Sequence, residues 1–270
     1  MFNVLKEIIA DHLGNLSQIF KLARADLVKT YRGAALGWSW AILRPGLTLF
    51  TYWFAFNFGL RSGADVNGFP FFLWLAVGIT PWFYMSDMLH SGTESIRKYK
   101  YLVNKMKFPV SVIPTFVSVS KLMVNMVLML IVLIIFWCAG YGPTIYYLQL
   151  PFYLLCSFLF WTLWAQLSSL LAAVSKDFLN LVKSFVTPLF WLSGILWRAD
   201  TLENNGWVSW VLKLNPITYI INGFRDCLVF DRWFFQAPDK LLFFVSWLVI
   251  LWLLSLWAYK RLRKEIPDVL

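Results

Sequence analysis

Long apolar runs separated by short polar or basic stretches dominate this chain. The runs cover about 36–60, 71–89, 110–138, 150–174, 185–197 and 241–259. A helix of about 20 mostly apolar residues crosses the hydrocarbon core of a bilayer, which is about 30 Å thick. The pattern therefore predicts an all-α integral membrane protein with six transmembrane helices in one domain, residues 34–270. The fifth run is short for a span and contains Pro188, and Pro81 predicts a kink in the second run.

The first 33 residues follow a different pattern. Apolar residues recur at helical spacing over 2–24, from Leu5 to Ala23, while Lys6 and Asp11 fall off the apolar stripe. This spacing predicts an N-terminal amphipathic interface helix, residues 1–33, that lies flat on the membrane surface. An ordinary surface helix packed on its own protein would have the same pattern.

A second amphipathic segment, 94–108, lies between the second and third runs. Its apolar positions share one face and its basic positions share another. A short helix of this kind fits a groove on a cytoplasmic partner, whereas a plain solvated loop needs no periodicity. We therefore expect partner contacts from one set of residues: Glu94, Ile96, Arg97, Tyr99, Lys100, Leu102 and Val103. The charged residues of 176–183 are interpreted as a further small loop.

A long insert, 198–239, separates the last two runs. Its pieces Trp207–Leu214 and Pro216–Phe230 have helical patterns, but neither can span, because Arg225 and Asp226 interrupt the second. They are joined at Asn215-Pro216. Backbone at membrane depth must be covered by protein or line a water-filled cavity. The insert is therefore predicted to be a re-entrant helical hairpin on the outer side, with a folded outer loop as the alternative.

The distribution of charge predicts the orientation. The chain carries 24 Lys and Arg against 14 Asp and Glu. Residues up to 32 hold five of the basic residues, 91–108 five, 175–183 two and the C-terminal tail four, so sixteen share one side and six the other. Basic residues gather on the cytoplasmic side and meet anionic lipid there. The chain is thus predicted to be a multi-pass plasma-membrane protein with both termini in the cytoplasm, and the positive charge does not require nucleic acid.

Catalytic motifs are missing from the sequence. It has two histidines, three scattered cysteines, no HExxH or GxSxG motif, and no GxxxxGK[ST] phosphate loop. We expect a transport protein rather than an enzyme, with no metal or cofactor on this chain. An ion-driven secondary transporter would need paired acids within the spans, but only Asp87 lies well inside one. A membrane-embedded transferase would need clustered carboxylates.

Some polar and aromatic residues inside the runs are candidates for a substrate pathway. Ser111, Ser118, Lys121 and Asn125 share one helix face, which either lines a pathway that meets an anion or makes interhelical hydrogen bonds. Arg44 either binds phosphate or extends to the interface. Aromatic residues of the first, second and fifth runs could face sugars or an isoprenoid chain, or simply pack. The candidates are Arg44, Tyr52, Tyr84, Ser118, Lys121, Asn125 and Trp191.

One continuous stretch resembles a known family. Residues 31–45, YRGAALGWSWAILRP, are similar to the first-span entrance of permeases in the polysaccharide-exporter group of ABC transporters. GITPW at 78–82, KFP at 107–109 and NPITYIINGFRD at 215–226 resemble other segments of that group. KLNP and GFRD are most similar to wall teichoic acid permeases, and O-antigen and capsule exporters share much of the pattern. Arg44 departs from the neutral residue that many relatives carry before the proline.

The resemblance implies an assembly and a cargo. It implies a homodimer of permeases with two copies of a separate ABC ATPase subunit, which would bind ATP and Mg²⁺. It makes 94–108 the coupling helix and 2–24 the interface helix beside the ATPase. It also implies export of an undecaprenyl-diphosphate-linked polysaccharide from the cytoplasm to the exterior.

Overall fold

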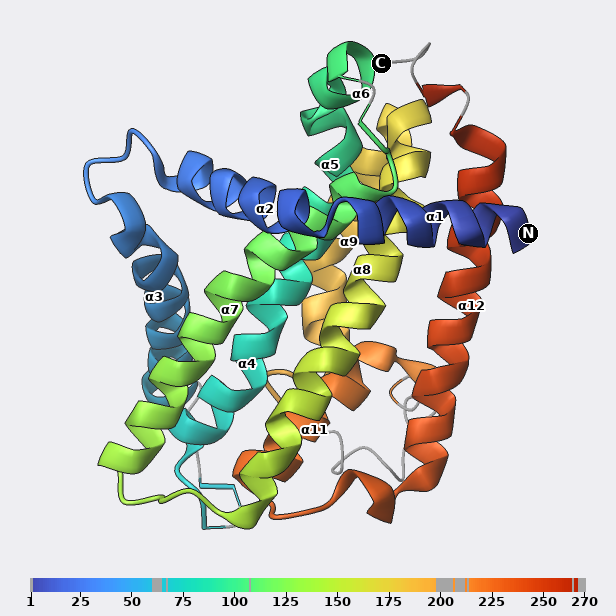
Figure 1. Cartoon of the computed structure of the whole chain (residues 1–270). Helices are drawn as coiled ribbons and strands as arrows, with labels where there is room; N and C mark the ends of the chain where they lie inside the picture. Colours follow the sequence, from blue (N-terminus) through green and yellow to red (C-terminus); the bar gives the residue numbers. More distant parts are fainter. Residues whose placement is uncertain are drawn as a thin grey trace.

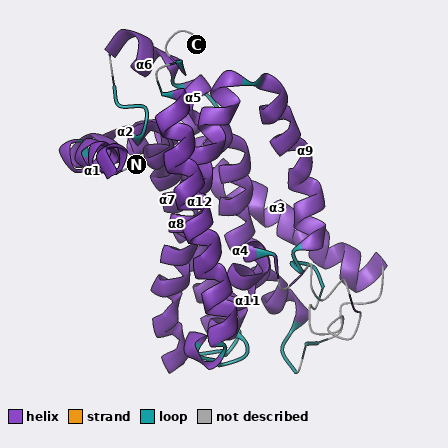
Figure 2. Cartoon of the chain, turned by 90° about the vertical axis from the view of Figure 1, so that its right-hand side faces the viewer, coloured by secondary structure: helices purple, strands orange, loops and turns teal. Residues whose placement is uncertain are grey.

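The computed structural model describes residues 2–59, 65–66, 68–106, 108–197, 206, 212, 214–263 and 265–266. Helices form nearly all of this part of the chain, and its one extended pairing is an isolated bridge between Val66 and Phe69 (Figure 2). The prediction of an all-α protein is therefore confirmed. The first half of the predicted outer hairpin, Trp207–Leu214, lies almost entirely outside the described residues.

Three of the described helices are long and apolar enough to cross a membrane. They are α7 (Val112–Cys138), α8 (Leu150–Val174), preceded by a 3₁₀ turn over Ile145–Gln149, and α12 (Pro238–Leu262). Three shorter helices also match predicted spans: α3 (Trp40–Phe54), α4 (Phe71–Asp87) and α9 (Lys176–Leu192). Single π-helical segments over Ala55–Gly59 and Met88–Gly92 extend α3 and α4. Each predicted span thus contains a helix, while the six-span count itself stays a prediction.

The amphipathic N-terminal segment forms two helices, α1 (Phe2–Gly14) and α2 (Leu16–Tyr31), with a break at Asn15. Both lie crosswise at one end of the bundle formed by the long helices (Figure 1). Ile19 and Ala23 on α2 are buried, whereas Phe20 on the opposite face is 57% exposed. The predicted single helix over 2–24 is corrected to two helices, and only part of its apolar stripe packs on the bundle, since Leu13 and Leu16 are 65% and 50% exposed.

Two local predictions are wrong. Residues 94–108 do not form one helix, because α5 (Thr93–Lys98) and α6 (Lys100–Met106) are separated at Tyr99, where φ is −109° and ψ is 26°. Residues 176–183 are not a loop, because they form the first turns of α9. The Ser175 hydroxyl accepts a hydrogen bond from the backbone N–H of Phe178 and so caps that helix.

The core has two parts that follow from the amphipathic patterns. The larger part fills the bundle between α4, α7 and α8, with Trp74, Phe136 and Trp161 at most 2% exposed. The smaller part lies where α2 crosses the bundle and includes Ile96 and Tyr99. The second part fixes the N-terminal helices to the segment predicted to contact a partner.

Helix α11 (Pro216–Leu228) packs inside the bundle against α4 and α8 (Figure 1). Its start is fixed by Asn215, whose side-chain oxygen accepts from the backbone N–H of Ile217 over 3.0 Å, and by Pro216 at the first helical position. Its residues Ile220, Ile221 and Phe224 have no exposed surface. The helix is thus part of the core rather than a peripheral loop element.

Gly223 lets α11 approach α8 closely, so Gly223→Ala is expected to destabilise the protein by about 1–3 kcal/mol. A Cβ atom at this position would overlap the ring of Tyr153, which is 2% exposed and cannot move freely. The matched control is Gly46→Ala on α3, where a Cβ meets open space and helix propensity favours alanine by about 1 kcal/mol. Thermal unfolding in detergent should separate the two variants, and equal melting temperatures would contradict this packing.

Candidate functional site

The polar face predicted on the third run mostly joins helices to one another. Ser118 on α7 shares hydrogen bonds with the Tyr84 hydroxyl of α4 over 2.7 Å and with Thr162 of α8 over 2.6 Å. The Asn125 side chain donates to the backbone carbonyl of Thr80 over 2.7 Å. Ser118, Tyr84 and Asn125 are buried. These contacts are the interhelical hydrogen bonds of the alternative for Ser118 and Asn125, and Tyr84 packs among them, while a place in the substrate pathway stays a prediction for all three.

Lys121, on the same helix face, behaves differently. Its Nζ lies 3.7 Å from Oδ2 of Asp87, which is an ion-pair distance but too long for a normal hydrogen bond. The Lys121 side chain is only 9% exposed, while that of Asp87 is 49% exposed. A buried ammonium is thus balanced by a carboxylate that has access to the space beside the bundle.

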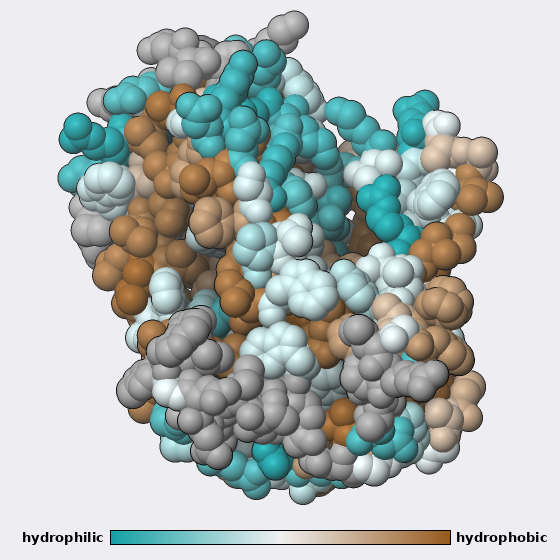
Figure 3. Space-filling view, turned by 180° about the vertical axis from the view of Figure 1, so that it is seen from behind, coloured by the Kyte–Doolittle hydropathy of each residue, from teal (hydrophilic) through white to brown (hydrophobic). Residues whose placement is uncertain are grey.

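A hollow flanked by hydrophilic atoms is visible from behind the molecule (Figure 3). Seen from behind, it lies in the half nearer α1 and α2, between the side that carries α3 and the centre of the bundle (Figure 3). Farther along, α3, α4 and α9 meet through aromatic rings. Phe190 of α9 lies 5.2 Å from Tyr52 of α3 and 5.4 Å from Trp82 of α4, measured between ring centroids. The groove between α3 and the bundle is therefore closed by aromatic contacts at that level.

Charged groups from several helices gather around Tyr31, toward the N-terminal end of α3. The charges of Lys121, Asp87 and Arg44 all act on the hydroxyl of Tyr31, the last residue of α2, and burial raises the pKa of that hydroxyl. Arg44 on α3 is exposed, and no hydrogen bond or ion pair joins its guanidinium to the residues that the structure describes. The groove thus has a charged end, where α7 carries the cation of Lys121 and α3 that of Arg44.

A second ion pair lies beside it. Lys183 of α9 and Glu94 of α5 are 2.6 Å apart, and both are partly exposed. The charges of Lys183, Glu94 and Asp87 act on His90 in the π-helical segment that extends α4. Charges of both signs, from α9, α5 and α4, therefore gather around His90.

The remaining pathway candidate is Trp191, on α9. It is 50% exposed, and its backbone carbonyl accepts from the Trp197 indole N–H over 2.8 Å. Its ring contacts that of Phe190, with centroids 6.0 Å apart. Tyr52 and Trp191 therefore belong to the aromatic end of the groove, and Arg44 and Lys121 to its charged end.

The apolar stripe of the 94–108 segment faces the chain itself. Ile96, Tyr99, Leu102 and Val103 are at most 7% exposed and belong to the smaller core. Arg97 donates to the backbone carbonyls of Ala172 and Ala173 at the end of α8, the latter over 2.9 Å. The expected contacts are thus corrected for these four apolar side chains, because they are covered, and stay a prediction for Glu94 and Lys100. Five described residues of this segment are exposed: Lys98, Lys100, Tyr101, Asn104 and Met106.

Asp26 is a buried carboxylate that the sequence interpretation missed. It lies on α2, is 2% exposed, and accepts hydrogen bonds from Lys98 over 2.7 Å, from the Tyr99 hydroxyl, and from Ser120 of α7 over 2.8 Å. Burial alone would raise the pKa of Asp26, but these donors and the Lys98 charge outweigh it and lower the pKa. A signal was available, because Asp26 follows Ile19 by seven residues and so lies on the apolar stripe of α2.

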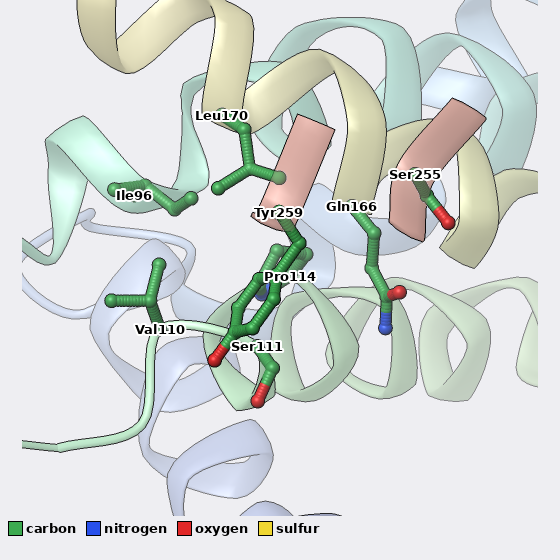
Figure 4. A pocket seen from close by; sticks show the side chains of 8 residues that line it. All are labelled: Ile96, Val110, Ser111, Pro114, Gln166, Leu170, Ser255 and Tyr259. Atoms are coloured by element: carbon green, nitrogen blue, oxygen red, sulfur yellow. The ribbon is translucent and has the colours of Figure 1, made fainter. Parts of the chain in front are cut away.

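Helix α1 is attached to the bundle by polar contacts. Ser111 donates to Asp11 over 2.8 Å, His12 hydrogen-bonds with Thr115 over 2.9 Å, and Arg263 pairs with Glu7. A small cavity of about 10 Å³ lies nearby among α5, α7, α8 and α12 (Figure 4). This volume is about that of one water molecule, so the cavity is too small for a polymer or a lipid. Its lining includes Ile96, Ser111, Gln166 and Tyr259.

The residues singled out in the predicted hairpin stabilise the fold. Arg225 is 2% exposed and donates to the carbonyls of Gly194 and Ile195 over 2.8 and 2.6 Å. Its guanidinium lies 3.6 Å from the ring centre of Trp74. Asn215 and Pro216 begin α11, and the carbonyl of Asp226 accepts from the backbone N–H of Arg232 over 3.0 Å.

Two comparisons with known proteins agree with this architecture. The model of a family described as ABC-2 type transporter matches residues 17–229. The chain is also 29% identical over 254 residues to the O-antigen export system permease protein RfbA of Myxococcus xanthus. That alignment covers 93% of this chain and 94% of the relative.

Proposed function

Because this chain belongs to the ABC-2 type transporter family, we propose that it is the permease subunit of an ATP-driven polysaccharide exporter. It would move an undecaprenyl-diphosphate-linked polymer from the cytoplasmic to the outer face of the plasma membrane. The observation that carries this proposal is the family match over 17–229, most of the chain, in a helical protein whose sequence has no phosphate loop of its own.

The proposed topology has six spans with both termini in the cytoplasm. Sixteen of the 24 basic residues then lie inside. Helices α1 and α2 would lie at the inner interface, since they cross the end of the bundle that carries α5 and α6 (Figure 1). Helix α11 would be the inner arm of an outer re-entrant hairpin, consistent with its burial between α4 and α8.

The proposed complex is a homodimer of this chain with two copies of an ABC ATPase subunit. ATP and Mg²⁺ would bind to the partner. The α5–α6 segment would be the coupling element, because it stands at the end of the bundle and is joined to α2, α8 and α9 by polar contacts. On ATP binding, the movement of this segment would separate α3 and α9 of one protomer from those of its partner and open a tunnel between the two protomers.

The partner contact is tested on the exposed face of α6. The double variant Tyr101→Asp/Met106→Glu is expected to reduce the amount of ATPase that co-purifies in mild detergent by at least about tenfold, since it places two charges in an interface. Tyr101 and Met106 are 44% and 67% exposed, so the change should leave the fold intact. Leu148→Glu, a change at a 74% exposed site in another part of the bundle, is the control. If the double variant still co-purified the usual amount of ATPase, the exposed face of α6 would not be the ATPase contact.

Two cargoes are candidates, and each rests on one observation. The KLNP and GFRD segments resemble the wall teichoic acid permease TarG, which favours an anionic teichoic acid. The relative RfbA is an O-antigen export system permease protein, which favours O-antigen. The purified complex in lipid vesicles should show ATPase activity that rises with one undecaprenyl-diphosphate-linked polymer and not with the other. No response to either polymer would refute polysaccharide export.

A further inference from the structure

We propose that the charged end of the groove binds a phosphate group, with Lys121 as its ligand and Asp87 as the internal anion that the phosphate displaces. This inference rests on the proposed function and deepens it, because it assigns the diphosphate of a lipid-linked cargo to particular residues. In the structure described above, Asp87 occupies the place of the phosphate. When cargo enters, the Lys121 ammonium would exchange the carboxylate for phosphate oxygens.

The geometry of the pair favours exchange. At a separation of 3.7 Å, the Lys121 ammonium donates no close hydrogen bond to Asp87. The ammonium is fixed in the bundle, since its side chain is only 9% exposed, whereas Asp87 is half exposed and can turn toward water. A buried lysine within a bundle requires an anion, and a phosphate fulfils that requirement with more acceptor oxygens than a carboxylate.

Two other ion pairs of this region do not combine a long distance with an exposed carboxylate. Lys98 and Asp26 are 2.7 Å apart, and Asp26 is fully buried and holds two further donors. Lys183 and Glu94 are 2.6 Å apart, which is a closed contact between α9 and α5. Both pairs therefore act as fixed connections between helices. Among these three pairs, only Lys121 and Asp87 combine a long distance with an exposed acid.

Arg44 supplies a second cation on the opposite wall. Its guanidinium is exposed on α3 and unpaired among the described residues, and its charge acts on Tyr31 together with the charges of Lys121 and Asp87. Guanidinium groups suit phosphate because their donors form a planar fork. A group carrying two phosphates could therefore be held between α7 and α3, beside Tyr31.

A phosphate could come from the cargo or from an anionic phospholipid headgroup. We assign it to the cargo diphosphate, which carries more negative charge than one phosphodiester and so competes better with Asp87. The test uses the purified full-length chain with its co-purifying subunits in phosphatidylcholine nanodiscs. Binding of undecaprenyl diphosphate is measured in one arm, and binding of phosphatidylglycerol in the other.

The expected result is a pair of opposite changes. Lys121→Met should weaken binding of undecaprenyl diphosphate by at least about tenfold, and Lys121→Arg should restore part of it. Asp87→Asn should tighten binding by roughly threefold to tenfold, because it removes the competing anion. Lys260→Met removes the same charge at an exposed site on α12 and should change nothing. If the ion pair were purely structural, Lys121→Met and Asp87→Asn would both destabilise the protein and both weaken binding. Weaker binding in Lys121→Met together with tighter binding in Asp87→Asn therefore identifies exchange of the carboxylate for phosphate.

Several results would overturn the assignment. Equal weakening by Lys121→Met and Asp87→Asn, or no change with either, would show that the pair is structural. Phosphatidylglycerol binding as tightly, with the same dependence on the variants, would make this a lipid headgroup site instead of a cargo site. These failures are distinct from failure of the proposed function, because co-purification of an ATPase and its stimulation by lipid-linked polymer would persist in the wild-type complex.

Discussion

Arg225→Met is expected to destabilise the protein by roughly 4 kcal/mol, which is enough to prevent recovery of folded material at physiological temperature. The substitution leaves the carbonyls of Gly194 and Ile195 without their donors, and each buried unsatisfied group costs about 1–3 kcal/mol. It also removes the guanidinium from the face of Trp74, which is 2% exposed. Arg225 thus fixes the turn after α9 to α11 and α4.

The measurement is thermal unfolding of detergent-purified protein, with membrane expression level as a second readout. Arg225→Lys should recover only part of the stability, because one ammonium cannot reproduce a two-carbonyl fork beside a stacked ring. Arg232→Met is the matched control, since Arg232 is exposed after α11 and its loss should cost less than about 1 kcal/mol. Wild-type stability in Arg225→Met, combined with lost export, would instead place Arg225 in the transport path.

Length and hydropathy alone identified the long helices correctly. Helices α7, α8 and α12 each have enough consecutive apolar residues to define a membrane-length element without tertiary information. The error at 176–183 arose because charge was interpreted as evidence for a loop. The helix signal was nevertheless local, since Ser175 is a good N-cap and Asp177 favours a first helical turn. Charge at the end of a span shows exposure to water and says little about backbone conformation.

The candidate site could be predicted only in part. The face shared by Ser118, Lys121 and Asn125 follows from helical spacing, but whether each side chain meets substrate or a neighbouring helix depends on α4 and α8. For 94–108, helical spacing likewise predicted correctly which apolar residues share one buried face. What it contacts depends on α2 and α7, which come from distant parts of the chain. Helical spacing determines which residues share one face of a helix. The neighbouring helix that this face contacts depends on the tertiary arrangement.

The break at Tyr99 explains how the 94–108 segment is connected to the rest of the chain. Periodicity continues across 94–108, so the sequence alone favours one helix. In the structure the Tyr99 hydroxyl donates a hydrogen bond to Asp26. The chain changes direction at Tyr99, and α6 begins after it. Because Asp26 also holds Lys98 and Ser120, one carboxylate joins α2, α5 and α7. A displacement of α6 by a partner would therefore reach α2, and through it α3.

Asp26→Asn is accordingly expected to lower stability by roughly 3 kcal/mol at neutral pH, the low end for a broken buried ion pair because Lys98 is 32% exposed. The pKa of Asp26 is lowered below its ordinary value of 3.8, so the wild-type carboxylate stabilises the fold above about pH 4 and loses that contribution as pH falls through the folded-state pKa. The wild type and Asp26→Asn should thus differ at pH 7 and converge in acid when unfolding is followed across pH. Tyr99→Phe retains the aromatic ring and the ion pair between Lys98 and Asp26, so it should lower the stability less than Asp26→Asn does. A constant difference at all pH values would mean that the charge of Asp26 is not what joins these helices.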